Sequence, residues 1–561
     1  MDYAKVERER RLESASRDRF DVAVIGGGIH GACVAREAAL RGYRVLLLEA
    51  KDYASATSSR SSKMLHGGIR YLEAGDVRLV REALLERAIL ARSAPHLVRL
   101  QRFLYPVLPQ STRPSWQVSI GLWLYDLLAQ LFRGDRSVVR QGPLRFPAHQ
   151  RLSPDAPEAR LLRELGLSCE MLFSYFDAQM DDARITVETI LGAEQAGTVT
   201  LNYTTLTGAA RHTDGWALTW RSDHPNREGE SLARYVVNMA GPWIAHVDRI
   251  FGARRELPVV YSRGAHLLFR KQWKLPGVIL PTGISGRYYF VWPYFSAAGE
   301  DVTLVGTTDR LTSEGEADPD ADESEIEELL GFLRRDLPHA GLDETQLYQT
   351  FCGVRVLAGT EALIRRTRRP VSAVSRSHRW QVDAARLTLI GGKFTSARHT
   401  ADEACGMMDA YFGRRTPSRA ASLDHPHPGG AGWSEERRME LLAAFDSAAA
   451  EHFGEGAGAE AQAAVQRFGT NAHLLLPRVQ QIGAQRDGTS FAEAVFRAQV
   501  AYVIRHEQAL GVEDILRRRL GVTLLPGQSL DQVGICAEEL IRQGGEPGVV
   551  SRSVAAYRER W

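Results

Sequence analysis

The feature that most constrains this chain is a glycine-rich turn near its N-terminus, placed between a short apolar run and a helical pattern. Residues 22–25 form an apolar run rich in β-branched side chains, which predicts a buried parallel strand. Glycines follow in G-x-G-x-x-G spacing, at Gly26, Gly28 and Gly31. This spacing allows a tight turn, a close backbone approach to a pyrophosphate, and close packing of the next helix on the strand.

The residues after this turn complete a nucleotide-binding unit. A helix predicted over about residues 29–41 would point its free N–H groups at phosphates, and Gly42 would cap its end. Residues 44–48 predict a second strand, and Glu49 lies at its tip, where a carboxylate can accept both ribose hydroxyls of an adenosine. The acid disfavours a 2′-phosphate and argues against NADP. The complete order favours a dinucleotide site over a bare strand–turn–helix unit.

Composition and cysteine spacing narrow the class of protein. The chain has 561 residues, of which 44% are hydrophobic and 25% charged, as in globular proteins of several domains. A formal net charge of +2 argues against a dedicated nucleic-acid-binding protein. The cysteines are scattered and form no C-x-x-C pair, which indicates a reducing compartment and no metal site.

Two features concern the termini and membranes. Residues 1–19 lack the apolar core of a secretory signal and predict a solvated, fraying lead-in. No run of about 18 apolar residues occurs, so we expect no transmembrane helix.

A segment rich in hydroxyl side chains follows Glu49. Its serines and threonines are poor formers of helices and strands, but they can lay hydroxyl and backbone N–H groups along a phosphate and a ribityl chain. An ordinary surface loop is the alternative. His66 and Arg70, beside the paired glycines Gly67 and Gly68, favour the interpretation as a site.

The segment from Trp116 to Phe132 combines apolar residues at helical spacing with aromatic side chains, and Arg113 and Arg133 flank it. These properties predict an interfacial helix that lies on a lipid surface. A core helix or the interface of a homodimer would show the same periodicity, and both remain alternatives.

The rest of the chain predicts an α/β fold with a Rossmann-like dinucleotide-binding domain, a β-rich substrate domain and a C-terminal helical domain. Apolar runs at residues 235–241 and 387–392 end in glycine turns and indicate strands that return to the first sheet. The expected boundaries are 1–19 for the lead-in, 20–75, 161–257 and 383–424 for the dinucleotide-binding domain, 76–160 for a helical, membrane-facing insertion, 258–382 for the substrate domain, 425–433 for a linker and 434–561 for the helical domain.

Several sequence blocks, in order along the chain, carry a resemblance to a known family. They are VIGGGIHG, ATSSRSSKMLHGGIRYLE, VNMAGPW, VGTTD, CGVRVL and GGKFTSAR, followed by GTNAHLLL in the helical tail. With these blocks the chain resembles the FAD-dependent glycerol-3-phosphate dehydrogenases, which are respiratory and membrane-associated. The resemblance extends from Asp21 to about Leu520, and the block over residues 56–73 is its most specific part.

The resemblance implies FAD as cofactor and a fold related to the amino-acid oxidases. It implies oxidation of sn-glycerol 3-phosphate to dihydroxyacetone phosphate, with hydride transfer to flavin N5. Electrons would pass to membrane quinone, from a cytoplasmic protein peripheral on the inner face of the cell membrane. The alternatives are a glycerophosphate oxidase that uses oxygen, an amino-acid-oxidase-like enzyme with another substrate, and a degenerate membrane-bound flavoprotein that serves as scaffold or sensor.

The family blocks also suggest residues for the reaction. Arg70 and Arg355 are the candidate phosphate ligands, because a guanidinium offers a planar fork that matches phosphate oxygens. His66, and second to it His266, are the candidate bases, since the pKa of histidine lies near working pH. Lys393 would lie near flavin N1 and stabilise the anionic reduced ring.

Further residues are expected around the substrate and the cofactor. Thr308 is expected to contact the substrate beside the ring. The expected cofactor-binding residues are Gly26, Gly28, Gly31, Glu49, Thr57, Ser58, Ser59, Ser62, Lys63, Gly241, Gly392 and Thr395.

Some positions depart from the family pattern. Val356 stands where the family usually has proline, Ala397 where it has tyrosine, and Ser285 where an acid is common. We expect the lost tyrosine to remove an active-site hydroxyl, which gives slight support to the degenerate flavoprotein.

Overall fold

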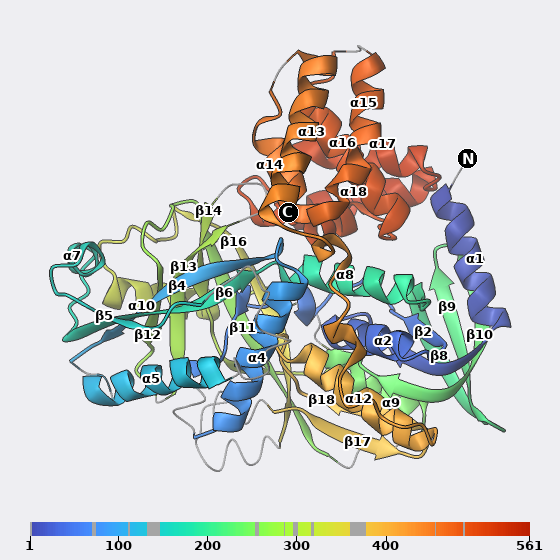
Figure 1. Cartoon of the computed structure of the whole chain (residues 1–561), viewed down its shortest axis with the longest axis horizontal. Coiled ribbons are helices and arrows are strands. Elements are labelled where there is room, and N and C mark those ends of the chain that lie inside the picture. The colour runs from blue at the N-terminus through green and yellow to red at the C-terminus, as the bar shows by residue number, and fades with distance from the viewer. Residues whose placement is uncertain are drawn as a thin grey trace.

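Two β-sheets and a helical domain make up the protein, as seen in a computed structural model (Figure 1). The structure describes residues 3–69, 75–109, 111, 113–131, 146–252, 257–284, 286–295, 301–315, 319–359, 377–454, 456–485 and 488–561. The described helices outside the C-terminal domain are α1 (Tyr3–Arg17), α2 (Ile29–Leu40), α4 (Val77–Ser93), α5 (Ser115–Leu131), α7 (Pro157–Glu164), α8 (Asp182–Gln195), α9 (Ile244–Ile250), α10 (Glu323–Asp336) and α12 (Ala397–Tyr411).

The first sheet is the predicted dinucleotide-binding sheet. Its strand order is β17-β18-β10-β1-β2-β7, and β8 and β9 extend it beside β10. The strands are β1 (Arg19–Ile25), β2 (Val45–Leu48), β7 (Val199–Leu201), β8 (Thr204–His212), β9 (Gly215–Asp223), β10 (Asn226–Asn238), β17 (Arg379–Asp383) and β18 (Arg386–Ile390). β2, β1, β10 and β18 run parallel, so their carboxyl ends meet at one edge, where ligands bind in such folds.

The second sheet has the order β15-β11-β14-β13-β12-β4-β6-β3, with β16 paired to β11 and β5 to β6. Helix α10 packs on it through a cluster of leucines. The strands are β3 (Met64–Leu65), β4 (Val98–Val107), β5 (Gln150–Leu152), β6 (Met171–Met180), β11 (Val259–Phe269), β12 (Gly277–Pro281), β13 (Tyr288–Phe295), β14 (Asp301–Gly306), β15 (Arg310–Thr312) and β16 (Leu347–Ala358).

Several strands, among them β4, β6 and β17, lie in a sheet that the expected boundaries do not give them. β4 lies within the predicted helical insertion and β6 within the predicted second part of the dinucleotide-binding domain, yet they pair antiparallel along their whole length in the second sheet. β17 was expected in the substrate domain but pairs with β18 in the first sheet. These strands are fixed by partners distant in sequence, which local periodicity does not reveal.

The N-terminal segment is also different from the prediction. Residues 3–17 form α1, which packs on the first sheet and fully buries Leu12 and Ala15. The buried Arg8 donates from Nη2 to the Asn202 carbonyl at 2.7 Å. The predicted solvated lead-in is therefore wrong, because a few apolar residues and one buried arginine are enough to dock a helix that is otherwise charged.

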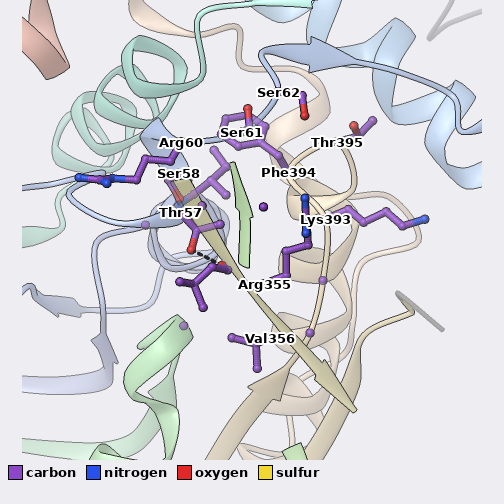
Figure 2. A pocket seen from close by; sticks show the side chains of 18 of the residues that line it. Thr57, Ser58, Arg60, Ser61, Ser62, Arg355, Val356, Lys393, Phe394 and Thr395 are labelled. Atoms are coloured by element: carbon purple, nitrogen blue, oxygen red, sulfur yellow. Dashed lines mark hydrogen bonds between the residues drawn. The ribbon is translucent and has the colours of Figure 1, made fainter. Parts of the chain in front are cut away.

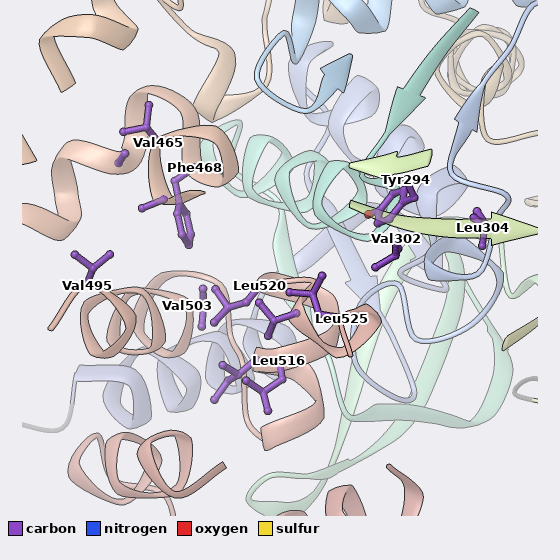
Figure 3. Close-up of a cluster of buried hydrophobic side chains, with 14 of the residues drawn as sticks. Tyr294, Val302, Leu304, Val465, Phe468, Val495, Val503, Leu516, Leu520 and Leu525 are labelled. Atoms are coloured by element: carbon purple, nitrogen blue, oxygen red, sulfur yellow. The ribbon is translucent and has the colours of Figure 1, made fainter. Parts of the chain in front are cut away.

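The C-terminal domain is helical, as predicted. Its helices are α13 (Glu435–Phe453), α14 (Gly458–Phe468), α15 (Leu476–Gln485), α16 (Phe491–His506), α17 (Val533–Arg542) and α18 (Pro547–Arg560). Its core is continuous with the second sheet: Figure 3 shows Leu520 and Leu525 of this domain in one cluster with Tyr294 and Val302. Tyr348 of β16 also donates its hydroxyl to the Leu524 carbonyl at 2.5 Å.

The segment predicted as a linker contains a buried histidine. His427 has Nδ1 2.7 Å from Ser93 Oγ and Nε2 3.0 Å from Thr189 Oγ1. Burial, with a smaller effect from Arg36, lowers the pKa of His427 to about 3. The imidazole is therefore neutral in the folded protein at any pH near neutrality.

This burial predicts an acid-labile contribution to stability. Above about pH 6.5 His427 is neutral in both states, whereas below it the unfolded chain binds a proton that the folded protein excludes. Stability is thus lost as pH falls from 6.5 toward 3. When the pH is lowered from 7.5 to 5.5, the free energy of unfolding should fall in both proteins. The fall should be about 1.4 kcal/mol smaller in His427→Gln than in the wild type, because the variant lacks the buried imidazole.

Urea unfolding at the two pH values, followed by tryptophan fluorescence, measures this difference. His425→Gln is the matched control, because His425 lies in the same segment but is exposed, and it should keep the wild-type pH dependence. The titratable and charged groups that act on His427 are Arg36, Glu188 and His96, which remain in both variants. Equal losses in His427→Gln and the wild type would contradict the prediction.

Candidate active site

A large cavity lies at the carboxyl edge of the first sheet and against one face of the second. Its volume is about 950 Å³, at the upper end of the range for small-molecule sites. The tip of β2, the start of α2, β11, β16 and the turn before α12 all contribute to its wall, and so does α5. Figure 1 shows α5 and β2 on opposite sides of the molecule, and residues of both line the cavity.

The glycine turn has the geometry that its spacing predicts. Gly26 has a φ of +113°, and a Cβ there would lie 2.6 Å from the Met239 carbonyl oxygen. A Cβ on Gly31 would lie 1.9 Å from the Gly26 carbonyl oxygen, so α2 can approach the turn only with glycine there. Gly28 lines the cavity at the N-terminus of α2, where backbone N–H groups attract an anion.

Glu49 lies at the edge of the cavity in a fixed orientation. Its Oε2 accepts a hydrogen bond from Gly27 N at 2.6 Å and its Oε1 one from Lys51 N at 2.8 Å. Burial raises the pKa of the Glu49 carboxyl, although both N–H groups act in the opposite direction. The carboxylate is thus held where the sequence expects the adenosine ribose.

Part of the hydroxyl-rich segment faces the cavity. Thr57 donates its hydroxyl to the Val354 carbonyl at 2.7 Å, and Ser58 Oγ accepts from Ile29 N at 2.9 Å. Ser62 Oγ lies 2.8 Å from His266 Nε2. Thr57, Ser58 and Ser62 all line the cavity (Figure 2).

Ser59 and Lys63, both expected to bind the cofactor, are not among the residues that line the cavity. Ser59 donates to the Ala56 carbonyl at 3.3 Å. The ammonium of Lys63 is buried, 2.8 Å from the Ser59 carbonyl and 2.5 Å from Asp182 Oδ1. The chain turns at Lys63, which has a φ of +57°, and this turn directs its side chain into the protein. The two cofactor-binding predictions are therefore wrong.

The second sheet brings an arginine and a histidine to the same face. In the register of β11 and β16, Ser262 pairs with Arg355 and His266 with Phe351. Alternate residues of a strand face the same side, so these side chains share the cavity face. The guanidinium of Arg355 lies beside Gly264, where a Cβ would be 2.2 Å from Nη2, and the glycine therefore makes room for it.

Arg355 is held by polar contacts at the cavity wall. Its Nη2 donates to Thr307 Oγ1 at 3.1 Å, and its Nη1 lies 3.3 Å from Asp309 Oδ1. Asp309 also accepts from the Ser262 hydroxyl at 2.6 Å. Arg355 is thus pre-oriented, and its side chain remains partly exposed at the cavity.

His266 is buried and stacks on Phe351, with ring centroids 4.7 Å apart. Burial, then the charges of Arg355 and Lys63, lowers the pKa of His266 to about 3. An imidazole with this pKa is a weak base at neutral pH. His66 also lines the cavity and is only half-buried.

Thr308, expected to contact the substrate, lies on the other side of its strand end. Its hydroxyl donates to Glu325 Oε1 at 2.7 Å and accepts from Ala265 N at 2.8 Å, and it is fully buried outside the cavity wall. Thr307 lines the cavity in its place. This prediction is wrong by one residue, since neighbours in extended backbone point to opposite sides.

The turn before α12 completes the cavity wall. Gly391 and Gly392 have φ values of +83° and +106°, in the left-handed region that favours glycine. Gly392, Lys393 and Thr395 line the cavity, and so does Gly241 after β10. In Figure 2, the side chains of Lys393 and Arg60 extend to opposite sides of the site.

Ala397 does not face the main cavity. Its side chain lines a separate cavity of about 40 Å³, together with Ile29, Thr189 and Arg398, between α2, α4, α8 and α12. The expectation that the alanine removes an active-site hydroxyl is therefore wrong. Ala397 therefore gives no support to a degenerate flavoprotein.

Two cavity residues, His30 and Arg60, were not predicted from the sequence, and two residues that the sequence singled out lie outside the described residues. His30, the second residue of α2, lines the cavity next to Gly392, where a Cβ would be 2.6 Å from His30 Nε2. Because His30 lies between Gly28 and Gly31 of the glycine motif, the sequence could have indicated that it lines the site. Arg60 also lines the cavity. Arg70 and Ser285 lie outside the described residues.

Comparisons with known proteins agree with this architecture. A family model for the FAD dependent oxidoreductases matches residues 21–388. A second model, for the C-terminal domain of alpha-glycerophosphate oxidase, matches residues 421–542.

Individual relatives cover nearly the whole chain. The D-erythritol 1-phosphate dehydrogenase of Brucella abortus is 32% identical over 90% of this chain and 95% of its own length. The glycerol-3-phosphate dehydrogenase of Pseudomonas aeruginosa is 31% identical over 91% of this chain and 94% of its own. The structure of the glycerol-3-phosphate dehydrogenase from Bacillus halodurans, complexed with FAD, superposes with a TM-score of 0.74 at 22% identity, covering 100% of this chain and 97% of that one.

Proposed function

The chain belongs to the FAD-dependent glycerol-3-phosphate dehydrogenase family, and we propose that it oxidises sn-glycerol 3-phosphate to dihydroxyacetone phosphate. The observation that carries the proposal is the position of Arg355, whose pre-oriented guanidinium lies in the wall of the cavity that also contains the cofactor-binding turn. A planar cation at this place suits a phosphate group on a small substrate.

FAD is the cofactor of this family, and the residues present fit it. The N-terminus of α2 with Gly28 would hold the pyrophosphate, and Glu49 would hold the adenosine ribose. When bound, FAD supplies the acceptor for the hydride of the substrate, which carries the two electrons of the oxidation. The turn at Gly392 and Lys393 would supply N–H groups and a positive charge to the ring.

The substrate then requires a phosphate ligand and a base from the protein. Arg355, in the cavity wall, would bind the phosphate. Arg70, which the family blocks of the sequence suggest, would be a second ligand. His66 is the proposed base for the hydroxyl proton, because the low pKa of His266 makes that residue a weaker acceptor. His266 would instead orient Ser62, 2.8 Å away, at the cavity wall.

A longer polyol phosphate is the second candidate substrate. The cavity wall includes the hydroxyls of Tyr105 and Tyr288, which lie 3.1 Å apart, and also Gln117 of α5. These groups could bind the extra hydroxyl of a four-carbon substrate, and the relative from Brucella abortus is named for D-erythritol 1-phosphate.

Anaerobic mixing of the purified flavoprotein with substrates tests the proposal. Glycerol 3-phosphate should bleach the flavin absorbance, whereas glycerol at the same concentration should not, because it lacks the phosphate. Stronger bleaching by D-erythritol 1-phosphate would favour the second candidate. Bleaching by an amino acid alone would indicate an amino-acid-oxidase-like enzyme, and no bleaching by either phosphate would contradict the proposal.

We also propose that the enzyme lies on the inner face of the cell membrane and passes electrons to quinone, with α5 as the contact. On its outer face Trp116, Ile120 and Trp123 are 60%, 55% and 58% exposed, and they recur at i, i+4 and i+7. The inner face of α5 buries Leu122 and Leu128 in the hydrophobic core, so this face of α5 has the character of a core helix.

The position of α5 supports a route for quinone. Gln117, Gly121 and Leu124 line the main cavity, and so does Ile120 of the exposed apolar stripe, so the stripe and the cavity meet along α5. An apolar acceptor dissolved in lipid could enter there without crossing water. Within the part of the chain that the structure describes, no helix has the length and apolar character to cross a bilayer.

A further inference from the structure

The loop that follows β2 is anchored by residues more than 450 positions away in sequence. Asp52 is 1% exposed, and Arg518 Nε donates to its Oδ2 at 2.5 Å. Arg519 donates through both Nη atoms, with Nη2 2.8 Å from Asp52 Oδ1. Both arginines belong to a π-helical turn of the C-terminal domain, η8 (Asp514–Arg519).

The same turn also anchors the neighbouring loop between β7 and β8. Tyr203 donates its hydroxyl to Asp514 Oδ1 at 2.7 Å, and its backbone N–H to the Lys51 carbonyl at 2.7 Å. Asn202 Nδ2 donates to Asp52 Oδ1 at 3.0 Å and to the Gln508 carbonyl at 2.9 Å. The two loops and the turn therefore form one buried polar network.

This network is continuous with the cavity wall at its adenosine end. Glu49 donates its backbone N–H to the Leu201 carbonyl at 2.9 Å, and Thr204 N donates to the Glu49 carbonyl at 2.8 Å. Glu49, Lys51 and Thr204 all line the cavity. One or two hydrogen bonds therefore join the residues that line the cavity at the expected ribose position to residues that the C-terminal domain holds in place.

The charges of the network explain why it has one stable arrangement. Burial alone would raise the pKa of Asp52, but the charges of Arg519 and Arg518 hold that pKa below its usual value. A buried ion pair is costly to separate, because each charge would remain without its partner in a low dielectric. The ion pairs to η8 therefore add to the backbone hydrogen bonds that hold the β2 loop in position.

We propose that the C-terminal domain retains the cofactor: η8 fixes the loops at the adenosine end of the cavity, and Arg518, Arg519 and Asp52 are positioning residues for FAD binding. The proposal requires FAD as cofactor but does not depend on the identity of the substrate. It gives the C-terminal domain a role at a site that none of its described residues lines.

FAD affinity of the full-length apoprotein, measured by flavin fluorescence, tests the proposal. Arg519→Met should weaken FAD binding about 10- to 100-fold and accelerate FAD release, since a charged hydrogen-bond pair is lost. Arg519→Lys should restore part of the affinity. The matched control is Arg386→Met, because Arg386 makes a similarly buried ion pair to Asp248, at the end of β18 opposite the cavity and outside this network.

The control separates cofactor retention from general stability. Arg386→Met should lower the melting temperature of the apoprotein and leave the Kd for FAD within about twofold of wild type. Equal weakening of FAD binding in both variants, or none in Arg519→Met, would overturn the proposal. If Arg519→Met does not fold, Tyr203→Phe removes one bond of the same network, and an unchanged Kd for FAD in that variant would overturn it as well.

Discussion

Replacing Arg355 by alanine should lower kcat/KM for glycerol 3-phosphate by about 10²- to 10⁴-fold, while the protein keeps its FAD. Two hydrogen bonds from a guanidinium to a phosphate contribute roughly 1.5–3 kcal/mol each, and each 1.4 kcal/mol is about a factor of ten. The loss should fall mainly on KM, because the phosphate is bound in the ground state as well as in the transition state. Steady-state kinetics with a soluble dye acceptor, together with the flavin content, measure both effects.

Two further measurements make the assignment of Arg355 specific. Added guanidinium should restore part of the activity of Arg355→Ala, because it can occupy the space beside Gly264 and contact Thr307. Arg355→Lys should stay impaired, since lysine cannot present the bidentate fork. Arg249→Ala, at an exposed arginine, is the control for a lost charge. Wild-type kcat/KM in Arg355→Ala would show that the phosphate binds elsewhere.

Local sequence was enough to predict the parts of the site that depend on backbone conformation. The turn at Gly26 and Gly31 has no room for side chains, so its residue types are dictated by local packing. The same reasoning found Gly392, whose φ of +106° favours glycine. At each of these glycines another part of the protein approaches the backbone closely, and a short sequence motif is enough to indicate such a position.

Side-chain direction could not be predicted from the same motifs. Thr307 and Thr308 are adjacent and identical, yet only the first lines the cavity. Lys63 turns inward to Asp182, a partner 119 residues away. Both outcomes depend on which face of the chain meets the second sheet or α8, and a motif does not contain that information.

Contacts between distant elements were also beyond the reach of sequence patterns. β4 and β6 are recognisable as strands of the second sheet only through their pairing with each other. The ion pairs from Arg518 and Arg519 to Asp52 join segments more than 450 residues apart. The hydrophobic periodicity of the sequence does not indicate such pairs. The domain organisation could therefore be predicted in outline, whereas its interfaces required the structure.

The exposed stripe of α5 should determine membrane binding, and Trp116→Glu with Trp123→Glu should release the protein from anionic vesicles. Each indole is more than half exposed and would contribute roughly 2–3 kcal/mol on entering the interface, so the double variant should bind at least about a hundredfold more weakly. High salt should weaken wild-type binding without abolishing it, because the apolar contribution remains. Vesicle sedimentation measures both effects.

Activity assays distinguish a membrane contact from a core role for the same helix. The double variant should reduce quinone in vesicles slowly but keep its turnover with a soluble dye, because Trp116 and Trp123 point away from the buried face of α5. Met439→Glu with Ile541→Glu is the matched control, since these apolar residues are similarly exposed in the C-terminal domain, and it should leave vesicle binding unchanged. Continued binding of the α5 variant would exclude the stripe as the anchor. Loss of FAD and of dye turnover would instead place these tryptophans in a core or dimer interface.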